Sequence, residues 1–166
     1  MNVHSADEVS VRRAAIEDLQ MIVATIEQFW GGRDVVGLHH ALYIHELGET
    51  ALMIGDDSGV LAYLLGFVTP AREGYIHVVA VREDQRGRGL ARTLYDEFAT
   101  LARARGAVAL KAITSPANTG SHAFHRTLGF SASEVPGYSA SGEARTVFRR
   151  ELDWALHLAG QERLSN

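Results

Sequence analysis

The chain has 166 residues, which is enough for one domain and little more. Hydrophobic residues make up 46% and charged residues 22%, a globular balance that excludes a mostly disordered chain and a collagen-like fibre. The formal net charge of -4 disfavours a nucleic-acid-binding protein, and the absence of cysteine excludes disulfides, thiolate zinc sites and a cysteine nucleophile. We therefore expect a single domain over residues 1–166 that binds no nucleic acid.

No apolar run approaches the roughly 18 residues that a membrane-spanning helix needs, because the longest covers residues 59–68. Residues 1–10 show no basic region followed by an apolar core, so we expect no secretory signal. These features predict a cytoplasmic protein that does not associate with membranes.

The first seventy residues predict one strand, two helices and a β-hairpin. The strand is indicated by weak alternation of apolar residues, the first helix by apolar residues at helical spacing, and the hairpin by two short strands around a polar turn. These elements are expected at residues 9–12 (strand), 16–30 and 38–47 (helices), and 50–54 and 60–69 (hairpin). The glycine pair Gly31 and Gly32 ends the first helix.

The second part of the chain begins with residues 75–81, which are apolar on both alternating faces apart from His77, as is typical of a central strand. The further elements are expected at residues 90–106 (a strongly amphipathic helix), 108–114 (strand), 118–128 (short helix), 130–135 and 145–152 (strands), and 153–166 (a tail with helical potential). This order predicts an α/β or α+β fold with a mixed sheet and a β-α-β unit in its middle.

A glycine-rich basic loop lies between the predicted central strand and the long helix. Gly87 and Gly89 allow close approach of a ligand, the first helical turn leaves N–H groups unpaired, and Arg86 and Arg88 add charge. Together these are the parts of an anion site for a phosphate or pyrophosphate, although a plain turn with solvated arginines is the alternative. The loop lacks the Gly-Lys-Ser/Thr ending of a Walker loop, and Arg92 stands where a dinucleotide fingerprint needs glycine.

The sequence Arg86-Gly87-Arg88-Gly89-Leu90-Ala91 resembles the acyl-CoA pyrophosphate loop, Arg/Gln-x-x-Gly-x-Gly/Ala, of the GCN5-related N-acetyltransferases (the GNAT family). Val79-Ala80-Val81 is similar to the strand that precedes this loop in the family. A second block, Asn118 followed by Phe124-His125-Arg126-Thr127-Leu128-Gly129-Phe130, resembles the family's Asn-…-Phe-Tyr-x-x-x-Gly-Phe segment. The resemblance covers residues 9–152, and the two blocks have the order and separation of the family.

The resemblance implies a strongly twisted mixed sheet with helices on both faces, splayed between two central parallel strands at residues 75–81 and 108–114. It implies acetyl-CoA as the acyl donor, with the pantetheine arm paired to backbone groups and the pyrophosphate on the loop amides. The implied acyl-CoA-binding residues are Val79, Ala80, Val81, Arg86, Gly87, Arg88, Gly89, Leu90, Ala91, Asn118 and Phe124.

Two histidines are candidate catalytic groups. At pH 7 an alkylamine costs about 4.6 kcal/mol to deprotonate, whereas release of the thiol as thiolate costs only about 2 kcal/mol, so a base matters more than an acid. His77 has a suitable pKa and stands where the arylalkylamine branch of the family carries a catalytic histidine; a core histidine is the alternative. His125 stands where many members carry a tyrosine assigned as general acid, and packing against the CoA arm or helix capping is the alternative.

Three aromatic residues are candidates for the acceptor pocket. Tyr75 shares a strand face with His77, Tyr138 lies in a predicted loop, and Trp30 lies where the family builds this pocket, with core packing as its alternative. The histidines at positions 39, 40 and 45 do not share one helix face, so we predict no metal.

We therefore predict an enzyme, an acetyl-CoA-dependent N-acetyltransferase that acts on a primary amine of a small molecule or peptide. Direct transfer in a ternary complex is expected because no cysteine can carry the acetyl group. The alternative is a non-catalytic acyl-CoA-binding regulatory or sensor module of the same fold. The identity of the amine stays open, and so does the choice between monomer and homodimer.

Overall fold

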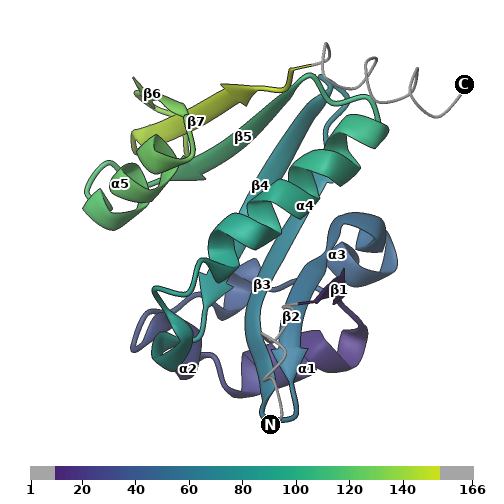
Figure 1. Ribbon diagram of the computed structural model, residues 1–166. Coiled ribbons are helices and arrows are strands. Elements are labelled where there is room, and N and C mark those ends of the chain that lie inside the picture. The colour runs from purple at the N-terminus through teal and green to yellow at the C-terminus, as the bar shows by residue number, and fades with distance from the viewer. Residues whose placement is uncertain (1–9, 154–166) are drawn as a thin grey trace, which may run out of the picture. The chain divides into compact units, whose positions relative to one another are not determined.

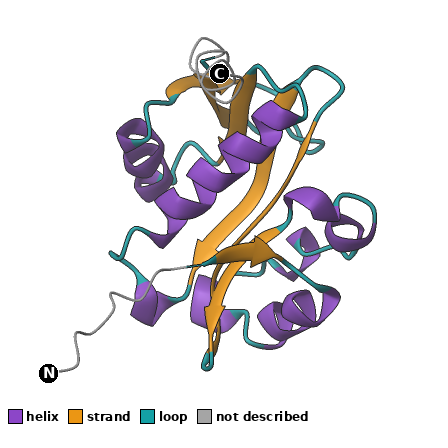
Figure 2. Ribbon diagram, turned by 45° about the vertical axis from the view of Figure 1, so that its right-hand side comes forward, coloured by secondary structure: helices purple, strands orange, loops and turns teal. Residues whose placement is uncertain are grey.

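The computed structural model describes residues 10–153 and contains a seven-stranded mixed sheet in the order β1-β2-β3-β4-β5-β7-β6 (Figure 1). The strands are β1 (Val11–Arg13), β2 (Leu52–Asp56), β3 (Gly59–Val68), β4 (Glu73–Val81), β5 (Ala109–Thr114), β6 (Ser131–Val135) and β7 (Arg145–Glu151). The helices are α1 (Ile16–Ala24), α2 (Glu27–Trp30), α3 (Leu42–His45), α4 (Leu90–Ala104) and α5 (Thr119–Thr127). Helices flank the sheet, as predicted for a mixed α/β fold (Figure 2).

The contacts divide the chain into two compact units. Unit 1 combines residues 1–65 with 78–98, and unit 2 combines residues 66–77 with 99–166. The prediction of a single domain stays a prediction. Nearly all of the predicted tail, residues 154–166, lies outside the described residues.

Unit 1 is built on the hairpin of β2 and β3, which pair antiparallel from Leu52–Leu64 to Asp56–Gly59. Asp18 joins β1 to α1, because its carboxylate accepts two 2.7 Å hydrogen bonds from Arg12 and one of the same length from the Ala15 N–H. This arrangement caps the first turn of α1, and the guanidinium holds the pKa of Asp18 below its usual value. The side chains buried in this unit include Leu19, Ile22, Phe29, Ile54, Tyr63, Leu64, Leu94 and Phe98.

The predicted helix over residues 16–30 is broken in its middle, and the prediction of one continuous helix is wrong. The Thr25 N–H donates to both the Met21 and Ile22 carbonyls, and its hydroxyl donates to the Met21 carbonyl at 2.8 Å. A threonine that bonds back to the preceding turn bends or ends a helix, so α1 stops there and α2 starts separately. The second predicted helix, over residues 38–47, is also shorter, because only α3 is α-helical and 3₁₀ turns precede and follow it.

Unit 2 contains the predicted parallel pair. β4 and β5 pair in parallel from Glu73–Ala109 to Ile76–Ala112, and β7 lies antiparallel to both β5 and β6. The helix between β4 and β5 in the chain is α4, so the expected β-α-β order is confirmed. The side chains buried in this unit include Ala102, Leu110, Ala112, Leu128, Phe130 and Phe148.

Candidate functional site

The predicted phosphate loop lies in unit 1 between β4 and α4. Gly87 and Gly89 have φ angles of 79° and 78°, a left-handed backbone that other residues rarely adopt. The Gly89 carbonyl accepts a 3.0 Å hydrogen bond from the Thr93 N–H, which is the first bond of α4. The two glycines therefore turn the chain from the strand into the helix within a few residues, as the sequence predicts.

The backbone amides of this loop are available to a ligand. Within residues 10–153, the N–H groups of Gly87, Arg88, Gly89, Leu90 and Ala91 donate to no protein acceptor. A Cβ atom placed on Gly87 or Gly89 would meet nothing within 4 Å, so the backbone is open on that side. Unpaired amides at the start of a 15-residue helix, with the positive end of its dipole, are the groups that the predicted phosphate site needs, and the site itself stays a prediction.

The two arginines of the loop have different surroundings. Arg86 donates from Nη2 to the Phe29 carbonyl at 3.0 Å and from Nε to the Val81 carbonyl at 3.4 Å. Arg88 donates from Nη1 to the Gln85 side-chain oxygen and stays exposed. Arg86 therefore braces the loop against α2, whereas the hydrogen bond of Arg88 goes to Gln85 within the loop.

A chain of buried hydrogen bonds fixes the segment that follows α2. The Trp30 indole N–H donates to the Tyr63 hydroxyl at 2.8 Å, and this hydroxyl lies 2.7 Å from Nε2 of His39. Nδ1 of His39 lies 2.8 Å from the Val35 carbonyl, which can only accept, so Nδ1 carries the hydrogen and Nε2 accepts from Tyr63. Burial lowers the pKa of His39 and raises the pKa of Tyr63, so both groups are held neutral.

Trp30 was predicted to line the acceptor pocket, and the structure gives it a packing role that the sequence named as the alternative. Its ring is half-buried, its N–H is bonded to Tyr63, and the Arg33 guanidinium lies 5.2 Å from its centroid. The pocket assignment of Trp30 stays a prediction. Sequence reasoning missed Tyr63 altogether, because a tyrosine inside an apolar strand carries no signal of its distant partners.

Burial alternates strictly along β4. Gly74, Ile76, Val78 and Ala80 are buried, and the residues on the opposite face are only half-buried: Tyr75, His77, Val79 and Val81. The sequence predicted these four on one face and expected the strand to be covered on both sides; the second face is only partly covered. The Tyr75 and His77 rings lie with their centroids 6.2 Å apart.

Asn118 caps α5 in unit 2. Its side-chain oxygen accepts a 3.1 Å hydrogen bond from the Ser121 N–H, and its amide donates to the Thr114 hydroxyl at the end of β5, also at 3.1 Å. The predicted CoA-contacting asparagine therefore fixes the start of α5 to the strand end. Phe124, the other predicted residue on this helix, is half-buried and lies edge-on to the His125 ring at 5.5 Å.

His125 is buried among aromatic rings. Its ring stacks on Phe148 with centroids 4.0 Å apart and an interplanar angle of 6°, and Phe130 meets it edge-on at 5.2 Å. Nδ1 lies 2.8 Å from the Ser121 carbonyl and therefore carries the hydrogen, which leaves Nε2 unprotonated in the neutral ring. Burial lowers the pKa of His125, and the neighbouring His122 lowers it further. The ring is thus packed against aromatic side chains of its own unit, and the predicted general-acid role stays a prediction.

The remaining predicted pocket residue, Tyr138, lies between β6 and β7 with 42% of its surface exposed. The predicted residues thus fall in both units. Those of unit 1 are Trp30, Val79, Ala80, Val81, Arg86, Gly87, Arg88, Gly89, Leu90 and Ala91, and those of unit 2 are Tyr75, His77, Asn118, Phe124, His125 and Tyr138.

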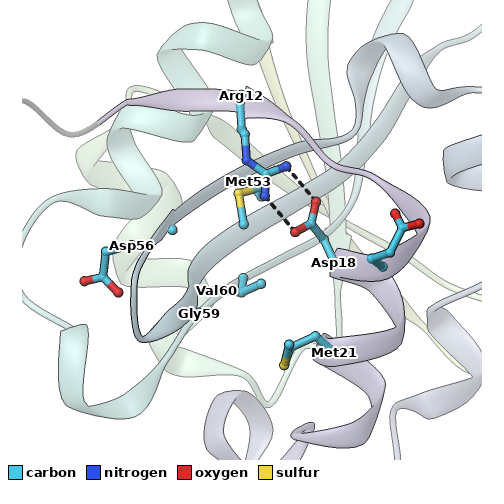
Figure 3. A pocket seen from close by; sticks show the side chains of 9 residues that line it. Arg12, Asp18, Met21, Met53, Asp56, Gly59 and Val60 are labelled. Carbon is cyan, nitrogen blue, oxygen red and sulfur yellow. Dashed lines mark hydrogen bonds and ion pairs between the residues drawn. The ribbon is translucent and has the colours of Figure 1, made fainter.

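A shallow cavity of about 310 Å³ lies in unit 1 beside the β2–β3 hairpin and α1 (Figure 3). The ion pair of Arg12 and Asp18 forms one wall, and Met21, Met53 and Val60 contribute apolar surface. None of the predicted site residues lines it. Over residues 10–153, no three histidine or acidic side chains gather in a group that could hold a metal ion, and no helix is long and apolar enough to cross a membrane.

Comparison with known proteins identifies the family. The model of the acetyltransferase (GNAT) family matches residues 19–130, more than half of the chain. The L-2,4-diaminobutyric acid acetyltransferase of Streptomyces coelicolor is 37% identical over 86 residues, which are 49% of this chain and 51% of that protein. The chain therefore spans about half the length of this curated relative.

Solved structures share the fold. Ard1 from Thermoplasma volcanium is similar with a TM-score of 0.74 at 18% identity, over 87% of this chain and 97% of that one. A chain of the NatC complex bound to Gag peptide and CoA has a TM-score of 0.71 at 15% identity, over 88% and 99% of the two chains. These likenesses confirm the predicted mixed α/β fold.

The two buried histidines predict acid-sensitive stability. Their pKa values are lowered in the folded state, so below the unfolded value of about 6.5 the unfolded chain binds protons that the folded chain does not. The free energy of unfolding should fall between pH 7 and 5, by at most about 1.4 kcal/mol per pH unit for each histidine. Urea denaturation across this range measures the slope.

Two replacements test whether His39 and His125 cause this pH dependence of the free energy of unfolding. His39→Gln and His125→Phe should each flatten it, and His45→Gln, which changes an exposed histidine, should leave it unchanged. A double variant of His39 and His125 that keeps the full slope would contradict the assignment.

Proposed function

Because the chain belongs to the GNAT family of acetyltransferases, we propose that it transfers an acetyl group from acetyl-CoA to a primary amine of a small molecule or peptide. The observation that carries this proposal is the loop of Gly87 and Gly89, which presents unpaired amides at the start of α4. The pyrophosphate of acetyl-CoA has the charge and the acceptor oxygens that such a loop binds. The CoA in the structure of the NatC complex, a fold neighbour, supports the same donor.

The acceptor class rests on two kinds of relative. The diaminobutyric acid enzyme acts, by its name, on a small amino acid with an additional amine, and the NatC structure contains a peptide. Amino acids and peptides both carry primary amines, and a primary amine needs to lose a proton before it attacks a thioester. The proposal is therefore stated at the level of a primary amine.

His77 is the proposed general base. It lies on the half-covered face of β4, where a side chain keeps access to solvent protons, and imidazole is the side chain used most often as a general base. The base takes a proton from the alkylammonium, a step that costs about 4.6 kcal/mol at pH 7 without help. The neutral amine then attacks the thioester carbon, and the backbone supplies N–H groups to the developing oxyanion.

His125 is proposed to hold the aromatic cluster of unit 2 rather than to donate a proton. Its hydrogen is committed to the Ser121 carbonyl, and the lowered pKa keeps the second nitrogen unprotonated at neutral pH. The CoA thiolate is a stable leaving group, because its release costs only about 2 kcal/mol at pH 7. No protein acid is then needed for collapse of the tetrahedral intermediate.

The first test concerns the acyl-CoA site. Gly89→Val should weaken CoA binding roughly 10- to 100-fold in calorimetry, because it strains the left-handed backbone and misplaces amides whose charge-assisted bonds are worth about 1.5–3 kcal/mol each. Gly106→Val is the matched control, since Gly106 has a φ of 84° and open space but follows the far end of α4. Equal CoA affinities in the two variants would show that the loop is not the site.

The second test concerns the order of chemical events. Direct transfer in a ternary complex predicts intersecting initial-rate plots with acetyl-CoA and amine varied, and an intact protein mass that never includes an acetyl group on the pathway. Parallel plots together with a trapped acetyl-enzyme would contradict direct transfer. CoA binding without thiol release for any amine in a broad panel would instead indicate the non-catalytic sensor module.

The third test separates the two histidines. His77→Ala should lower the turnover rate at pH 7 by roughly 10²- to 10⁴-fold and recover partly at high pH, where the amine loses its own proton. His125→Phe preserves a ring against Phe148 and should cost less than about tenfold, with no such recovery. His45→Ala, at an exposed position, controls for the loss of an imidazole. A folded His77→Ala variant with full activity beside an inactive His125→Phe variant would reverse the roles.

A further inference from the structure

Arg86 connects the phosphate loop to a segment distant in sequence. Its Nη2 donates to the backbone carbonyl of Phe29, 57 positions earlier in the chain, and its Nε donates to Val81 at the end of β4. Phe29 lies in α2, next to Trp30, and the loop and the helix are neighbours in unit 1 (Figure 1). Arg86, which the sequence predicts only as a ligand of acyl-CoA, therefore also binds the backbone of α2.

Two further contacts of α2 go to Tyr63. The Phe29 ring meets the Tyr63 ring edge-on with centroids 5.2 Å apart, and the Trp30 indole donates to the Tyr63 hydroxyl. α2 is only four residues long and has little stability of its own. Its position therefore depends on Tyr63 on one side and on the Arg86 guanidinium on the other.

A guanidinium can serve two partners at once. Arginine has five N–H donors in a planar fork, and two of the Arg86 nitrogens are used toward the carbonyls of Phe29 and Val81. Its Nη1 is bonded to no other described residue, and Arg86 directly precedes Gly87 in the chain. A phosphate oxygen on the loop amides can accept from that nitrogen while the bond to Phe29 persists.

We propose that Arg86 is a positioning residue that couples acyl-CoA binding to α2, with one guanidinium bridging the pyrophosphate and the Phe29 carbonyl. The inference rests on the proposed function, because it needs the pyrophosphate on the loop. A bound phosphate fixes the guanidinium, the guanidinium shifts the Phe29 carbonyl that it binds, and the surroundings of the neighbouring Trp30 indole change. The acceptor side of the enzyme then has its final form only when the acyl donor is bound.

The test uses Trp30 as an internal probe. The sequence has two tryptophans, and Trp154→Phe leaves Trp30 as the single one. In that background, titration with CoA should change the emission of Trp30, with calorimetry reporting CoA binding in parallel. Arg86→Met should still bind CoA but lose more than half of the emission change at saturation. Arg88→Met is the matched control, since the hydrogen bond of Arg88 goes to Gln85 within the loop; this variant should weaken CoA binding and keep the full emission change.

A kinetic measurement reads the same coupling. The KM for the amine should rise roughly five-fold or more in Arg86→Met, the lower range of measured couplings between sites, and stay within about two-fold in Arg88→Met. Arg86→Lys keeps the charge without the planar fork and should behave like Arg86→Met if bridging is the cause. If Arg86→Lys shows the same amine KM and Trp30 emission change as the parent protein, charge alone suffices, and the proposed bridge is overturned.

Other outcomes also decide the proposal. A full Trp30 response in CoA-saturated Arg86→Met, or no response in the parent background while calorimetry detects CoA, would overturn the coupling and leave the proposed function intact. If Arg86→Met weakens CoA binding as much as Gly89→Val does, Arg86 acts as a phosphate ligand alone, and the proposed coupling is also overturned. Failure of the parent protein to bind CoA would overturn the proposed function, and this inference with it.

Discussion

The left-handed backbone at Gly87 and Gly89 is the constraint on which the candidate site depends. These two positive φ angles shape the end of the loop that joins β4 to α4, and a Cβ atom at either glycine would meet nothing within 4 Å. A side chain at either position would strain this left-handed backbone. The proposed anion site of unit 1 therefore depends first on backbone geometry, and the arginine charges are an addition to it.

Backbone geometry of this kind needs support from outside the loop. Arg86 provides it from the loop side by binding carbonyls of α2 and β4, and Tyr63 provides it from the sheet side by accepting from Trp30 and donating to His39. In the series of hydrogen bonds from Trp30 through Tyr63 and His39, each N–H or O–H donor meets an acceptor, so these buried polar groups are all paired. Removing one member of such a network would leave a buried polar group unpaired and would lower the stability of the fold. The fully paired network is therefore a rigid support for a short helix.

The sequence predicted the elements whose signals are local. The β2–β3 hairpin, the glycine loop between β4 and α4 and the short helix α5 depend on residues a few positions apart, and the structure contains all three. The break at Thr25 was missed because the same residues also fit one long amphipathic stripe. The Tyr63 network was missed because its partners are 24 and 33 positions away, and only the folded chain brings them together.

The histidines show why residue type alone does not assign chemistry. His39 and His125 each give the Nδ1 hydrogen to a backbone carbonyl four positions earlier and lie in apolar surroundings that lower the pKa, so both are fixed in one neutral form. A general base has to gain a proton from the substrate and return it to solvent in every turnover, which a buried ring in a fixed tautomer does poorly. His77 lies on the half-covered face of β4 instead. The same side chain is therefore suited to packing in two positions and to proton transfer in the third, and the difference comes from the burial that the surrounding elements impose.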